Sequence, residues 1–406
     1  MSENKSSLTL YLAGDACKDF YPYELELDEG LSSLYRGRLT VLSGTSHTAE
    51  ELLALLDQKV SVSVSQRLSD NRARRSRWLH GIVSAIECDG VIVGVNKQDC
   101  YRTVLTIEPE LARLRNTMRT ESFYNVNPVD IAENILNRYE IKANFSGDYI
   151  NRRKYGGHLM FEELNESRLS FLDGLLRLYG LSYTFCHPRA GDSTLMDAEL
   201  YFSDGERYPV SEVVYSDNRK SQAAVVHFDF LAKDEEHNLW KMDGWRMKTG
   251  IGIDGIALSA VYPSSSRGNN DWRRGQTGEN NRFYNYINHL HSYSRETTEE
   301  EIDNDVKLIL DARYLSMQLN KSRWEGEAEN LALVPGLVFE LARLYGTNDK
   351  GVITALVTAI KLSARTVWPA NLAMPPDTDE GEFVNVRAVC TDFGKNSQRR
   401  FVPKYL

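Results

Sequence analysis

The chain has 406 residues, of which 42% are hydrophobic and 26% charged, and its formal net charge is −9. This composition is typical of a globular protein with two to four domains. The acidic balance argues against a nucleic-acid-binding protein, which needs a broad basic field. No apolar run approaches the roughly 20 residues of a membrane-spanning helix, and no signal peptide is visible at the N-terminus, so synthesis in the cytoplasm is expected.

Residues 1–118 are predicted to form a first small β-barrel or split barrel. The segments "SLTLYLAG", "YELELDEG" and "KVSVSVSQRL" alternate apolar and polar residues, as half-buried strands do. The segment "TAEELLALLD" has leucines at helical spacing, and Thr48 is expected to cap its N-terminus. About six strands around one short helix predict a small barrel.

Residues 119–208 are predicted to be an α/β domain that contains a doubled unit. The segments "DIAENILNRYEIKANF" and "SFLDGLLRLYGLSYTF" start 40 positions apart (170 − 130 = 40), and Tyr139 of the first then matches Tyr179 of the second. Each segment reads as an amphipathic helix followed by a strand. One such unit cannot bury its own apolar face, whereas two units can pack on each other. Packing therefore explains the repeat without any catalytic side chain.

The ends of these two helices carry recognisable signals. Asn127 before Pro128 predicts the start of the first helix, and Asn165 is expected to cap the second in the same way. Gly180 directly follows Tyr179 and is expected to end the second helix in the left-handed conformation.

Residues 209–368 are predicted to form a second β-barrel domain with one long helix. Segments such as "GIALSAVYP" and "GVITALVTAIKLSA" read as strands. The segment "EEEIDNDVKLILDARYLSMQL" reads as a helix. Its apolar residues lie along one stripe: Ile302, Val306, Ile309, Leu310 and Met317.

Residues 369–406 include a strand-like "FVNVRAVC" and a basic end, and are expected to form an extended tail without a core of its own. The whole order predicts a mixed α+β, β-rich fold class. Two small β-barrel-like domains would bracket the α/β helix–strand region.

Three motifs suggest chemistry, and none predicts a site. "GIGIDG", residues 250–255, fits GxGxxG, but a strand-like segment follows it where dinucleotide binding needs a helix N-terminus. His289 and His291 could face one metal ion, but no third ligand lies at short spacing. Cys186 and His187 are neighbours on a predicted strand and would face opposite ways. We expect no catalytic, cofactor or metal site, and no enzyme.

The segment "RARRSR", residues 72–77, is the strongest local basic cluster. Its position between two strands predicts a hairpin loop. The loop is either a solvated surface or a docking site for an acidic neighbour in an assembly. It lacks the interleaved aromatic residues expected of a nucleic-acid-binding surface.

The order of parts resembles the N-terminal hub region of VgrG, the spike protein of type VI secretion, and the hub proteins of contractile phage tails. The resemblance covers about residues 8–403. It is carried by "ELDEGLSSLYRGRLTVLSG", by "RWLHGIVSAIE" with "YRTVLTIEPELARLR", by the two helices of the doubled unit, and by "LDARYLSMQLNKSRWEGEAENLALVPGLVFEL". The last of these includes the motif residues Trp324, Gly326, Pro335 and Gly336.

The resemblance implies a structural role in a contractile injection machine. Three copies would form a ring whose six barrel-like lobes meet a hexameric, Hcp-like tail tube, with a spike or tip protein and baseplate components as further partners. Assembly in the cytoplasm and delivery with the machine would follow. Aromatic and basic residues are expected at the interfaces between copies: Trp240, Trp245, Trp272, Arg72, Arg74 and Arg75.

The sequence departs from the VgrG pattern at its end. The chain stops at Leu406, where VgrG would continue into an OB-fold and a β-helix needle. We expect either a truncated chain or a short hub whose spike is a separate protein, and no direct membrane insertion by this chain. Three alternatives stay open: a phage-type hub, a cell-wall hydrolase with unidentified carboxylates, and a monomeric binding module.

Overall fold

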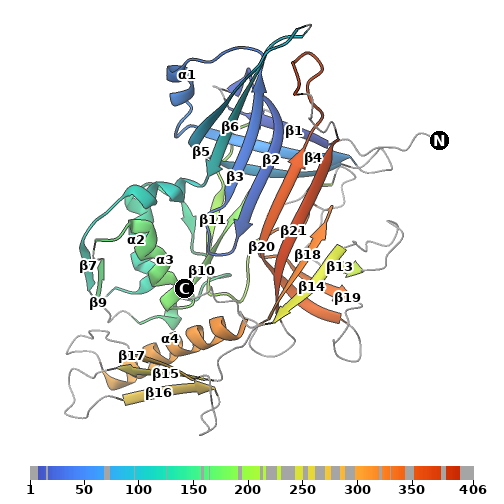
Figure 1. The fold of residues 1–406 in the computed structure, drawn as a ribbon. Coiled ribbons are helices and arrows are strands. Elements are labelled where there is room, and N and C mark those ends of the chain that lie inside the picture. Colours follow the sequence, from blue (N-terminus) through green and yellow to red (C-terminus); the bar gives the residue numbers. More distant parts are fainter. Residues whose placement is uncertain are drawn as a thin grey trace.

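A computed structural model gives the fold of the chain (Figure 1). It describes residues 8–14, 17–67, 74–95, 97–124, 126–156, 160–163, 165–190, 194–210, 214–215, 226–229, 243–249, 255–260, 270–275, 284–288, 298–319, 322–329, 331–342, 352–375 and 381–393.

A large sheet dominates the described part of the chain, and its strands come from both ends of the sequence. The main order is β1-β4-β5-β6-β3-β2-β20-β21-β18-β14. Three further strands attach to it: β12 pairs with β5, and β13 pairs with β19, which pairs with β20. The bounds are β1 Leu8–Ala13, β2 Tyr21–Gly30, β3 Arg36–Ser43, β4 Lys59–Arg67, β5 Arg74–Ile92, β6 Cys100–Glu108, β12 Val214–Tyr215, β13 Val226–Asp229, β14 Asp243–Thr249, β18 Ser322–Ala328, β19 Val338–Ala342, β20 Val352–Arg365 and β21 Phe383–Asp392.

The pairing of β2 with β20 joins the two halves of this sheet. It is antiparallel and runs from Glu24 opposite Arg365 to Gly30 opposite Ala359. The alternation of the strand explains the local structure, because Leu25 and Leu27 are buried while Glu26 between them is exposed. Strands of the first and third predicted domains therefore share one hydrogen-bonded sheet. The predicted domain boundaries themselves stay a prediction.

β21 occupies an interior place in the sheet, paired with β20 on one side and β18 on the other. Its alternate residues are buried against the core: Val384, Val386, Ala388 and Cys390. The expectation of a tail without a core did not anticipate this position, because the strand's partners lie elsewhere in the sequence.

The doubled unit consists of α2 (Pro128–Arg138) with β8 (Ala143–Asn144), and α3 (Arg168–Leu178) with β10 (Ser182–Cys186). The two helices pack together beside the large sheet (Figure 1). β8 and β10 lie on either side of β11 (Glu199–Ser203), parallel and antiparallel to it respectively. The repeat therefore buries its apolar faces in a shared unit, as predicted.

The two helices end in the same way. The backbone N–H of Ile141 donates to the carbonyl of Leu136 at 3.0 Å, and that of Leu181 donates to Leu176 at 2.8 Å. The residue before each donor is left-handed: Glu140 has a φ of 57° and Gly180 a φ of 65°. This is the Schellman stop, so the prediction for Gly180 is confirmed.

The prediction for the first helix start is also confirmed, and that for the second is wrong. The Asn127 side chain accepts from the N–H groups of Val129 and Asp130, at 2.8 and 3.2 Å. The second helix is capped by Ser167, which accepts from the N–H of Ser170 at 3.1 Å. Asn165 has a φ of 47° and lies in the turn before the cap, because Ser167 reaches the first turn directly.

The long helix α4 (Glu299–Leu319) packs on a three-stranded sheet of order β16-β15-β17, with bounds β15 Gly255–Ala260, β16 Asn270–Gly275 and β17 Tyr284–Asn288. Its predicted stripe is confirmed: Ile302, Val306, Ile309 and Leu310 are buried, and Met317 packs against the core.

Shorter elements complete the described fold. α1 (Ala49–Leu53) starts with a capping box, in which Thr48 and Glu51 exchange hydrogen bonds, as the Thr48 prediction expects. The others are the 3₁₀ helices η2 (Glu110–Asn116) and η3 (Arg152–Lys154), and the paired strands β7 (Glu121–Tyr124) and β9 (Met160–Glu163). The fold is mixed α+β and β-rich, as predicted. Among the described residues, no helix is both long and apolar enough to cross a membrane.

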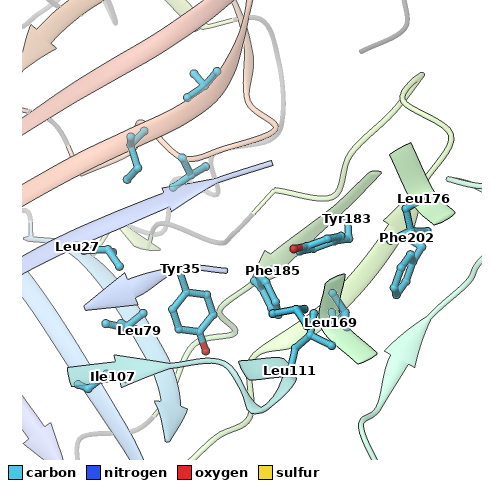
Figure 2. Close-up of a cluster of buried hydrophobic side chains, with 14 of the residues drawn as sticks. Leu27, Tyr35, Leu79, Ile107, Leu111, Leu169, Leu176, Tyr183, Phe185 and Phe202 are labelled. Atoms are coloured by element: carbon cyan, nitrogen blue, oxygen red, sulfur yellow. The ribbon is translucent and has the colours of Figure 1, made fainter. Parts of the chain in front are cut away.

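Aromatic and aliphatic side chains fill the space between the large sheet and the doubled unit. Figure 2 shows Tyr35 and Phe185 side by side in this cluster. Their rings meet edge to face, with centroids 5.0 Å apart. This core fixes the doubled unit against the first half of the sheet.

Candidate functional site

A buried ion pair lies where three regions of the chain meet. The Glu29 carboxylate on β2 bonds the Arg77 guanidinium on β5, and the two side chains are only 3% and 2% exposed. Arg77 also donates to the backbone carbonyl of Leu333 at 3.2 Å. The pair thus ties β2 and β5 to the turn that precedes β19.

Two histidines extend this buried junction to the doubled unit. The backbone N–H of His80 donates to Nδ1 of His187 at 3.2 Å. Because Nδ1 accepts, a neutral His187 carries its proton on Nε2, which lies 3.7 Å from the Glu29 carboxylate. The His80 ring bonds the Ser61 hydroxyl at 2.8 Å and the Pro188 carbonyl at 2.7 Å. The Tyr35 hydroxyl donates to the His80 carbonyl.

Burial sets the charges of this junction. It lowers the pKa of His187 well below its usual 6.5, and His80 and Arg77 lower it further. Burial raises the pKa of Glu29 and lowers that of Arg77, while each partner opposes the other's shift. The junction therefore combines one ion pair with neutral imidazoles. Its side chains are almost fully buried and hold these regions of the chain together.

The sequence analysis missed this junction and counted Arg77 within a basic loop. The signal was the strand period of two. Glu29 follows Leu25 and Leu27 on the inward face of β2, and Arg77 shares an inward face with Leu79. Opposite charges on two inward faces indicate a buried pair.

A second charged cluster lies on the outward face of the large sheet, at its β14 end. The Glu325 carboxylate on β18 is 5% exposed. It accepts from Lys248 at 2.8 Å and Arg387 at 2.9 Å, with Arg323 at 3.4 Å and Arg246 at 3.6 Å. Hydrogen bonds from Lys248 and Arg387 lower the pKa of Glu325 to about 2. Sequence alone could not show this cluster, because three separate strands supply its residues.

A cavity of about 250 Å³ lies between the first half of the sheet, η2 and the end of the first repeat unit. Three of its charged lining residues, Lys59, Glu110 and Arg113, take part in ion pairs. Lys59 bridges Asp197 at 2.5 Å and Glu110 at 3.4 Å, and Arg113 binds Asp57 at 2.8 Å. These pairs stabilise the wall of the cavity.

The structure describes the predicted interface residues only in part. Arg72 and Trp240 lie outside the described residues. Backbone alone is described for four others, which lie on β5, β14 and β16: Arg74, Arg75, Trp245 and Trp272. Their interface role stays a prediction.

The residues of the tested chemical motifs are placed only in part. His289 and His291 lie outside the described residues, as does the GxGxxG motif except for Gly255. Cys186 and His187 are both buried, and His187 belongs to the junction above. Within the described ranges, no group of three or more His, Cys, Asp or Glu side chains could hold a metal ion.

The motif residues have structural positions. Tyr139 and Tyr179 are the C-caps of α2 and α3. Trp324 and Gly326 lie within β18, between β14 and β21. Pro335 and Gly336 form a turn before β19, where Gly336 has a φ of 87° and packs against Tyr208.

The fold is similar to that of solved structures from phage tails and type VI secretion systems. It is similar to the E. coli c3393 protein, a component of the type VI secretion system (TM-score 0.57, 15% identity, 97% of this chain and 79% of that chain). It is also similar to a tail protein of Neisseria meningitidis (TM-score 0.58, 8% identity, 95% of this chain and 97% of that chain). A chain of the Francisella PdpA–VgrG complex is similar too (TM-score 0.56, 11% identity, 99% of this chain and 59% of that chain). No curated protein matches the chain.

The sequence itself carries the assignment to a family. The family of phage tail baseplate hubs (GPD) matches residues 28–366. The chain belongs to this family.

Proposed function

We propose that the chain is a non-enzymatic hub subunit of a contractile injection machine. Three copies form a ring with pseudo-sixfold symmetry, which connects a hexameric, Hcp-like tail tube to a spike. The observation that carries the proposal is the family match over residues 28–366. The continuous sheet supports it, since the β2–β20 pairing holds the two halves of each subunit in a fixed relation.

The machine is a type VI secretion system in our proposal, with a contractile phage tail as the alternative. The similar structures include a component of a type VI secretion system and a prophage tail protein. The subunit is assembled in the cytoplasm and delivered with the machine. Spike or tip and baseplate proteins are its further partners.

Native mass in solution tests the ring. The chain has a mass of 46.2 kDa, so light scattering over a range of concentrations is expected to give about three times that mass. Electron micrographs of the same sample are expected to show threefold rings. A chain that stays monomeric at every concentration contradicts an autonomous hub.

Binding to tube proteins tests the machine. The purified ring is expected to bind a hexameric Hcp ring in preference to a phage tube protein, measured by co-sedimentation. Preferential binding to the phage tube favours the alternative. Absence of binding to either contradicts the hub proposal.

A further inference from the structure

Among the described residues, β14 lies at the end of the large sheet and is largely exposed. In the described part of the chain it pairs with β18 alone. Every residue of β14 whose exposure is described is exposed: Gly244, Arg246, Met247, Lys248 and Thr249. Met247 is 55% exposed. Exposed apolar residues at the edge of a sheet favour contacts with another chain.

The basic cluster beside this edge has unused capacity for acidic groups. Four cations surround one Glu325 carboxylate, and the four side chains are 42–58% exposed. A carboxylate accepts about four hydrogen bonds, whereas three arginines and one lysine carry many more donors. Glu327 is also exposed and lies opposite Arg387 in the sheet. With this carboxylate counted, the cluster still has an excess of two positive charges, in a chain whose net charge is −9.

The complementary charge lies at the start of α4. Glu299 and Glu300 are exposed there, and a capping box between Thr298 and Glu301 fixes the turn. α4 has 21 residues, which corresponds to about 30 Å. Its other end lies beside β21, where the Thr391 hydroxyl donates to the Leu319 carbonyl at 3.4 Å. Since β21 carries part of the basic cluster, the acidic turn of the same copy lies about a helix length away.

We propose that the β14 edge and its basic cluster bind the acidic first turn of α4 of a second copy of this chain. The contact joins two different surfaces, so it is heterologous, and it closes into a ring when the rotation between copies allows. The proposal rests on the trimer proposed above and names the surfaces that hold it. Charge complementarity sets its register.

A matched pair of charge reversals tests the docking. Glu300→Lys reverses the charge at the second position of α4, and Glu50→Lys does the same in α1, which has an equivalent capping box. Both changes cost the helix a similar interaction with its dipole. Glu300→Lys is expected to raise the concentration for half-assembly at least ~5-fold, and Glu50→Lys to leave it unchanged. Light scattering measures both.

A double-mutant cycle checks that the two surfaces meet. Arg246→Gln/Arg323→Gln removes two cations that lie further from Glu325 than Lys248 and Arg387. If α4 docks there, adding Glu300→Lys to this variant is expected to weaken assembly less than it does alone. Thermal unfolding of the monomer confirms that each variant folds.

The outcomes separate the docking from the trimer. A stable wild-type trimer in which Glu300→Lys and Glu50→Lys behave alike overturns the docking and leaves the hub proposal intact. Additive effects in the cycle overturn it too. A wild-type chain that never assembles overturns both. If Arg246→Gln/Arg323→Gln does not fold, the matched pair alone decides.

Discussion

Two residues 40 positions apart adopt the same backbone conformation with different side chains. Glu140 ends α2 and Gly180 ends α3, both with positive φ. Glycine adopts this conformation without steric cost, whereas a residue with a Cβ does not. We expect Glu140→Gly to raise the free energy of unfolding by about 0.5–1 kcal/mol, and Gly180→Ala to lower it by about 1 kcal/mol. Urea unfolding measures both. Equal effects at the two positions would contradict the shared stop.

Asp173 predicts a pH dependence of stability. Burial raises its pKa from 3.8 to about 6, against the opposing charge of Arg177. The folded chain therefore holds this proton more tightly than the unfolded chain, so the stabilisation is complete below about pH 4 and is lost as the pH rises through about 6.

We therefore expect Asp173→Asn to stabilise the protein by roughly 1–3 kcal/mol at about pH 7.5 and by little at about pH 4. Urea unfolding at the two pH values measures this difference. The control is Glu133→Gln at the matching position of the first unit, where Glu133 is more exposed and pairs with Arg152 at 2.8 Å. Equal effects of the two substitutions at both pH values would contradict the role of burial.

Substitutions of Glu29 and Arg77 are expected to have strongly non-additive effects on the free energy of unfolding. Arg77→Met leaves a buried carboxylate without its cation, and we expect this to lower the free energy of unfolding by about 3–5 kcal/mol. Adding Glu29→Leu removes the orphaned charge and is expected to recover a large part of the loss. Urea unfolding of both variants measures the difference. A double variant less stable than Arg77→Met alone would refute this account.

At the scale of elements, the sequence predicted what is local. The alternation of β2 and β4, the caps Thr48 and Asn127, and the apolar stripe of α4 all follow from residues close together in the chain. The wrong prediction at Asn165 is also local, because Asn165 and Ser167 both lie near the start of α3 and either could have capped it.

What could not be predicted is which distant strands pair. β2 meets β20 across more than 300 residues (352 − 30 = 322), and no local pattern encodes that contact. The basic cluster around Glu325 exists only after β14, β18 and β21 are aligned. Strand alternation could have predicted that Glu29 and Arg77 each point inward, but it could not have predicted that they pair with each other.

Because β21 lies inside the sheet, neighbouring residues on it are expected to differ in how well they tolerate an acidic substitution. Val386 is fully buried, whereas Asn385 points to the other face and is partly exposed. We expect Val386→Asp to destabilise the protein by about 4 kcal/mol or more, because the carboxylate has no partner in the core. Asn385→Asp is expected to change stability by less than about 1 kcal/mol. Thermal unfolding compares the two. Tolerance of Val386→Asp would place β21 at the surface.

At the scale of the whole molecule, the shared sheet predicts cooperative unfolding. Leu27 and Leu362 face each other across the β2–β20 pairing and are both buried. If the β2–β20 pairing couples the two halves, calorimetry of the protein is expected to show one transition. Leu27→Ala is expected to destabilise the core by about 2–5 kcal/mol and to shift this transition as a unit. Two peaks, of which only one moves, would mean that the halves unfold independently.

The same pairing has a mechanical consequence. Its hydrogen bonds lie side by side along β2 and β20, so a force directed along the strands loads them together in shear and not one after another. A force applied to one half of the molecule then passes to the other half through these hydrogen bonds between the two strands. A subunit built this way resists shear between its two halves and transmits force with little deformation.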